Sequence, residues 1–177
     1  AYRRQRQMCI RDSLDAGYDR AQTLTAVNGM MLLAGQGERF TTVDLFLLDL
    51  WTGKASLDKL GAAGSYLMQS EGLSLLGGDA LPLGILENVE SGEKLMQLHQ
   101  GDTLILLSDG VEDAYENRQS MEETIRDALT LETAQDAANA ILTGAPSGDS
   151  APADDQTVLV LRLIRARADA KIEEMYQ

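Results

Sequence analysis

Apolar and polar side chains alternate with a period of two through much of the chain between residues 42 and 107. This spacing is typical of β-strands, because successive side chains of an extended chain point to opposite faces. Short turns rich in glycine and polar residues separate the alternating runs. The pattern predicts strands at residues 42–50, 55–60, 65–69, 73–76, 94–99, 103–107 and 157–164. The first strand has apolar residues on both faces, and we expect it to be buried on both sides.

Helical spacing of apolar residues is found in residues 14–34, 121–129 and 133–142. The first helix is expected to break around Gly17 and to end before the glycines at 35 and 37. A Gly/Pro/Ser/Ala/Asp loop is predicted at residues 144–153. Strands come as antiparallel hairpins and helices come in blocks, which predicts an α+β fold rather than a doubly wound parallel sheet.

The first 13 residues, AYRRQRQMCIRDS, are basic and have no hydrophobic period. Residues 8–13 are what a transposase adapter used in sequencing libraries encodes when it is read as protein. We therefore interpret residues 1–13 as adapter-derived and non-native, with a natural basic N-terminus as the alternative. The domain proper is then expected at residues 14–165, followed by a charged tail at 166–177 that we predict to be helical.

The chain has 28 acidic and 15 basic residues, a formal net charge of −13. This charge argues against nucleic acid and anionic membrane surfaces as partners, because both are polyanions. No apolar run approaches the roughly 18 residues of a membrane span, so we expect no membrane contact by this segment. The single cysteine, Cys9, excludes an internal disulfide and suits a reducing compartment. A cytoplasmic domain is therefore expected.

Two acidic motifs are candidates for chemistry. Asp109 and Gly110 follow the apolar strand at 103–107, and Asp154 and Asp155 precede the strand at 157–164. A carboxylate at the end of a buried strand is rigidly held, and Mg²⁺ and Mn²⁺ favour such oxygen donors. Taken alone, the first motif is also explained by an ordinary Asp-Gly turn, and the second by a solvated acidic loop.

The order of several segments is more specific than either motif. The segment FTTVDLFLLDLWTGKASLDKLGAAGSYLM at residues 40–68 is followed by LPLGIL at 81–86 and GDTLILLSDGVEDA at 101–114. Together with LDAGYDRAQTLTAVNGMMLL at 14–33 and the Asp-Asp-x-Thr at 154–157, they resemble the C-terminal part of PPM-type (protein phosphatase 2C-like) phosphatases. Within that class they are most similar to the stage II sporulation protein E branch.

This resemblance implies an antiparallel β-sandwich flanked by helices, with two divalent cations, Mn²⁺ or Mg²⁺, at one end. It implies metal-dependent hydrolysis of phosphoserine or phosphothreonine by a metal-activated water, without a protein nucleophile. By the same resemblance Asp109 and Asp154 are metal ligands. The resemblance also implies that Asp155 lies behind the metal ligands and orients them, and that Gly110 leaves room at the metal.

The family's upstream D-G-x-G-x-G aspartates have no counterpart here, so we expect an N-terminally truncated domain that binds metal weakly and has exposed sheet edges. The implied partner is a phosphorylated anti-sigma-factor antagonist in sporulation or stress signalling. The resemblance implies that this chain is a cytoplasmic domain of a longer parent protein, which is membrane-anchored in the resembled branch. A homodimer is one possible assembly of this parent. The alternative is a non-catalytic phosphatase-fold module that binds a phosphoprotein or a regulator.

Overall fold

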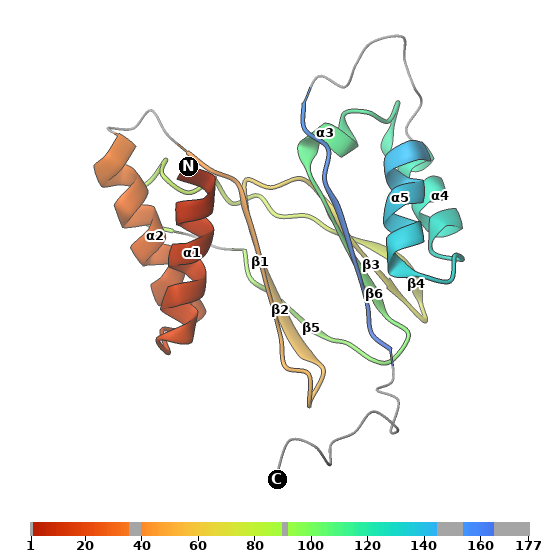
Figure 1. The fold of residues 1–177 in the computed structure, drawn as a ribbon, viewed down its shortest axis with the longest axis horizontal. Coiled ribbons are helices and arrows are strands. Elements are labelled where there is room, and N and C mark those ends of the chain that lie inside the picture. Colours follow the sequence, from red (N-terminus) through yellow and green to blue (C-terminus); the bar gives the residue numbers. More distant parts are fainter. Residues whose placement is uncertain (1, 36–39, 90–91, 145–153, 165–177) are drawn as a thin grey trace.

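The computed structural model describes residues 2–35, 40–89, 92–144 and 154–164 (Figure 1). Its helices and strands are, in chain order, α1 (Tyr2–Asp15), α2 (Arg20–Gly35), β1 (Val43–Leu48), β2 (Lys54–Leu60), β3 (Ser65–Gln69), β4 (Gly72–Leu76), β5 (Lys94–Gln97), β6 (Thr103–Leu107), α3 (Asp109–Glu112), α4 (Arg118–Ala128), α5 (Ala134–Gly144) and β7 (Val158–Arg162). The strands form two antiparallel sheets, with α1 and α2 outside one sheet and α4 and α5 outside the other. The predicted α+β sandwich is confirmed.

The first sheet has the order β1-β2-β5, and its two faces have different neighbours. On the outer face, Leu45 packs with Leu24 and Val27 of α2. On the inner face, Phe46 contacts a cluster that contains Leu104 of the other sheet. The prediction that this strand is covered on both sides is therefore confirmed, because alternate residues of β1 enter two separate hydrophobic clusters.

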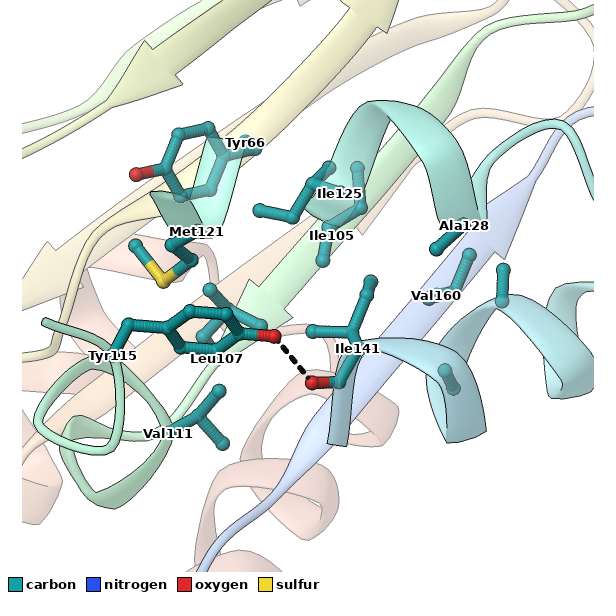
Figure 2. Close-up of a cluster of buried hydrophobic side chains, with 12 residues drawn as sticks. Tyr66, Ile105, Leu107, Val111, Tyr115, Met121, Ile125, Ala128, Ile141 and Val160 are labelled. Atoms are coloured by element: carbon teal, nitrogen blue, oxygen red, sulfur yellow. Dashed lines mark hydrogen bonds between the residues drawn. The ribbon is translucent and has the colours of Figure 1, made fainter. Parts of the chain in front are cut away.

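The second sheet has the order β4-β3-β6-β7, and its outer face carries the larger buried cluster. Figure 2 shows this cluster, in which Ile125 of α4 and Ile141 of α5 pack against Ile105 of β6. The hydroxyl of Tyr115 donates a hydrogen bond of 2.6 Å to the carbonyl of Ile141. Both helices are thus fixed to the sheet on the side opposite to the first sheet.

The structure departs from the sequence-based expectations at two helices. Residues 2–15 form α1, a helix that was missed because its basic sequence lacks a clear apolar period; Ile10 and Leu14 pack beside the α2 cluster. The break predicted around Gly17 is confirmed, since this glycine has a φ of 87° between α1 and α2. The turn expected after β6 is instead a single helical turn, α3.

Other expectations fall at the margins of the structure. The tail at 166–177 and all but the first residue of the loop at 144–153 lie outside the described residues. Within the described part of the chain, β1 and β5 form the edges of the first sheet and β4 and β7 those of the second. None of the described helices is both long and apolar enough to span a membrane.

Candidate metal centre

The two acidic motifs lie side by side because β6 and β7 are neighbours in the second sheet. Ser108, directly after β6, donates its N–H to the Thr157 carbonyl at 3.0 Å. Its hydroxyl accepts from Thr157 N at 2.9 Å and donates to the Asp155 carbonyl at 3.2 Å. These bonds join residues 47 to 49 positions apart and fix the start of α3 against the chain that enters β7.

The contact between residues 108–110 and 154–157, here called the seam, is close because Gly110 has no side chain. A Cβ built on Gly110 lies 2.6 Å from the carbonyl oxygen of Asp155 and 3.2 Å from that of Asp154. The Gly110 carbonyl also accepts from Nε2 of Gln156 at 3.1 Å. The space into which a side chain at this position would point is therefore filled by protein backbone, and the expectation that Gly110 leaves room at a metal stays a prediction.

Asp109 and Asp154 line one pocket of about 410 Å³, together with Asp155 and Asp44. Oδ1 of Asp109 accepts from Gly110 N at 3.0 Å, and Oδ1 of Asp154 accepts from Asp155 N at 2.7 Å. Within the described residues no hydrogen bond reaches Oδ2 of Asp109 or Oδ2 of Asp154, and both residues are exposed. Two carboxylates from different segments are thus available to the same pocket.

Asp44 was not identified from the sequence as part of the site. It lies on β1 directly opposite Lys59 of β2, and Nζ of Lys59 donates to its Oδ1 at 2.6 Å. Burial raises the pKa of the Asp44 carboxyl, while the hydrogen bond and charge of Lys59 act in the opposite direction. An aspartate inside an otherwise apolar strand was the available signal, and the hairpin turn before residue 54 would have paired it with the lysine.

The donor chemistry suits a hard divalent cation, because carboxylate oxygens together with water are typical ligands of Mg²⁺ and Mn²⁺. Among the residues that the structure describes, however, no group of three or more His, Cys, Asp or Glu side chains is close enough to hold a metal ion. The pocket therefore offers Asp109 and Asp154 as part of a ligand set. Other donors are needed for a tight site.

Two curated relatives match this chain. The stage II sporulation protein E of Priestia megaterium is 28% identical over 102 residues, which cover 58% of this chain and 17% of that protein. The protein of the same description from Bacillus subtilis (strain 168) is 28% identical over 98 residues, covering 55% of this chain and 12% of that protein. The matched regions thus span about a sixth or less of the curated relatives.

Solved structures show the same fold. The PP2C phosphatase domain of SpoIIE from Bacillus subtilis, with a fragment of its regulatory domain, aligns with a TM-score of 0.77 and 23% identity over 93% of this chain and 50% of that one. The catalytic domain of the serine threonine protein phosphatase PstP, in complex with 2 manganese ions, aligns with a TM-score of 0.68 and 18% identity over 92% of this chain and 82% of that one.

The similarity to these structures supports the fold, whereas the family follows from the sequence itself. Residues 5–164 match the family described as Stage II sporulation protein E (SpoIIE), which is most of the chain and includes both acidic motifs and the helices α2, α4 and α5. The chain therefore belongs to the SpoIIE family and has the fold of the PPM-type phosphatases.

Proposed function

We propose that this chain is the C-terminal part of a metal-dependent protein serine/threonine phosphatase domain. The observation that carries the proposal is that Asp109 and Asp154, from segments that precede and follow two helices, line the same pocket. Bound Mn²⁺ or Mg²⁺ supplies a water of lowered pKa and neutralises phosphoryl oxygens. The residues of this chain act by holding oxygen donors in fixed positions.

Each proposed role has a structural support. Asp109 and Asp154 would bind the metal through the Oδ2 atoms that make no hydrogen bond within the described residues. Ser108 and Gly110 keep the two segments at a fixed spacing, through hydrogen bonds and through close backbone contact. For Asp155 we propose a supporting role, since its carbonyl accepts from Ser108 and its residue lines the pocket. Preorganised donors of this kind are what a catalytic metal site requires.

We further propose that the missing donors come from parts of the domain outside this chain. Two carboxylates bind a divalent cation weakly, so this chain is expected to show little turnover by itself. The substrate that we propose is a phosphorylated anti-sigma-factor antagonist, on the basis of membership in the SpoIIE family. A sporulation or stress-signalling role, a cytoplasmic location and a homodimer of the parent stay predictions.

A second candidate function is a binding module of the phosphatase fold that recognises a phosphoprotein or a regulator without hydrolysing it. The specific observation in its favour is that the described residues contain no cluster of three or more potential metal ligands. The two candidates differ in whether the complete domain turns over a phosphate ester when Mn²⁺ is present.

The test uses the complete phosphatase domain, in which this chain is extended upstream with the sequence that its gene encodes. We expect Mn²⁺-dependent hydrolysis of an aryl phosphate and of a phosphoserine peptide, and a loss of more than about 100-fold in Asp109→Asn, since a metal ligand is removed. Asp113→Asn is the matched control, because Asp113 is an exposed carboxylate beside the same short helix and does not line the pocket. An extended domain that binds the phosphopeptide with no turnover would favour the binding module.

A further inference from the structure

A lysine with no solvent-accessible surface, Lys59, lies between the two sheets behind the wall of the carboxylate pocket. Its Nζ donates to Oδ1 of Asp44 at 2.6 Å and to the hydroxyl of Ser65 at 2.8 Å. An ammonium group in such a position is strongly unfavourable without a close counter-charge. Lys59 and Asp44 therefore form an ion pair in which Asp44 lines the pocket and the buried Lys59 does not.

Asp44 is also part of the pocket that Asp109 and Asp154 line. None of the described residues that line this pocket is a lysine or an arginine. Lys59 reaches Asp44 from behind the wall and is thus the cation that compensates this third carboxylate. Within the described residues Oδ1 of Asp44 accepts from the lysine and no hydrogen bond reaches its Oδ2, so the lysine acts on this carboxylate through its charge.

We propose that Lys59 is a built-in counter-cation that compensates the charge of Asp44 at the metal pocket and so keeps the affinity of this pocket for a divalent cation low. This inference rests on the proposed function, because it concerns the same pocket. Lys59 acts through Asp44 and contacts neither substrate nor metal, so it is a positioning residue. Its role would be to set the metal concentration at which the site fills.

The charge argument gives the direction and size of the effect. Removing the lysine charge leaves the negative charge of ionised Asp44 uncompensated, and this charge attracts a divalent cation bound at Asp109 and Asp154. For an assumed separation on the order of 8 Å between Asp44 and a divalent cation, and an effective dielectric constant of roughly 40–80, Coulomb's law gives a gain in affinity of about 5- to 30-fold. Removing both charges of the pair returns the pocket to its original net charge.

The experiment is a calorimetric titration of the full chain with MnCl₂, at constant pH and ionic strength. We expect Lys59→Met to bind Mn²⁺ about 5- to 30-fold more tightly, and Lys59→Met combined with Asp44→Asn to return to within about 3-fold of the unaltered chain. Lys54→Met is the matched control, because it removes the same charge from an exposed position on the same strand. We expect no more than a 2-fold change there.

If Lys59→Met is too unstable for calorimetry without metal, the thermal unfolding midpoints of this variant and of the double variant are measured at increasing MnCl₂ concentration. A steeper rise than in the double variant then supports the proposal, because ligand binding to the folded state raises stability by mass action. Equal or weaker binding by Lys59→Met, or a gain that persists in the double variant, overturns it. If Asp109→Asn leaves Mn²⁺ binding unchanged, the proposed metal site itself fails, which separates the two conclusions.

Discussion

Replacing Gly110 with alanine tests the seam that brings the two acidic motifs together. The new methyl group would lie 2.6 Å from the Asp155 carbonyl oxygen, about 0.8 Å short of the 3.4 Å at which ordinary contact begins. The obstacle is backbone, which cannot rotate away as a side chain can. The chain at 154–155 or the start of α3 must therefore move.

The magnitude follows from two losses and one gain. Forcing an extra carbon into a packed seam costs typically about 1–3 kcal/mol. A movement of this size also weakens the bonds from Gln156 to Gly110 and from Ser108 to Asp155, each contributing about 0.5–1.5 kcal/mol. Alanine is the better helix former by about 1 kcal/mol, which offsets part of the loss. We expect a net destabilisation of about 1–3 kcal/mol.

The assay is urea denaturation followed by circular dichroism, combined with Mn²⁺ titration. Gly29→Ala is the control, because Gly29 lies inside α2 and a Cβ there meets nothing within 4 Å; this variant should gain up to about 1 kcal/mol. Gly110→Ala should also lose Mn²⁺ affinity, since Asp109 and Asp154 shift relative to each other. The reasoning is refuted if Gly110→Ala matches Gly29→Ala in stability.

Three further predictions concern groups outside the pocket. The hydroxyl of Tyr66 is fully buried without a hydrogen-bond partner in the described part of the chain, and burial raises its pKa to about 12. Removing this hydroxyl in Tyr66→Phe should therefore stabilise the fold by about 1 kcal/mol in urea denaturation. Tyr115→Phe loses a hydrogen bond and should destabilise the fold by a similar amount. Arg20 pairs with the fully buried Asp58. Arg20→Met should therefore lower the free energy of unfolding by about 3–5 kcal/mol, because it leaves a buried charge uncompensated, and adding Asp58→Leu should recover most of that loss. A hydroxyl and two backbone N–H groups of the hairpin turn lower the pKa of Asp49 below 3.8. The stabilisation of the turn by Asp49 is therefore complete above pH 3.8 and is lost as the pH falls through the folded-state pKa. The amide NMR resonances of the turn should follow this titration, and a midpoint above pH 3.8 would contradict the prediction.

The strands show how far local patterns reach. Residues 65–69 and 103–107 were predicted as strands and have those bounds in the structure. The strand predicted at 42–50 is shorter, Val43–Leu48, because Asp49 accepts hydrogen bonds from the turn that follows. Period-two alternation depends only on the extended backbone, so it can be recognised without knowing the partner strand.

Other features depended on neighbours that a linear pattern does not contain. Helix α1 gains its apolar contacts through Ile10 and Leu14 at the α2 cluster, although its own composition is basic. Lys59 alternates like a surface residue in a strand, yet it is fully buried because Asp44 and Ser65 accept its hydrogen bonds. Whether a lysine in a strand is exposed or paired is decided by the residues opposite it.

The α+β class, the strands, the helices α2, α4 and α5, and two acidic motifs of the right chemistry could be predicted from the sequence, because these are properties of short segments, whereas α1 and α3 could not. The pairing of residues 108–110 with 154–157, and the place of Asp44 in the same pocket, depend on the tertiary structure. Contacts between segments more than 40 residues apart follow from how the two sheets bury their apolar faces, which no local period records.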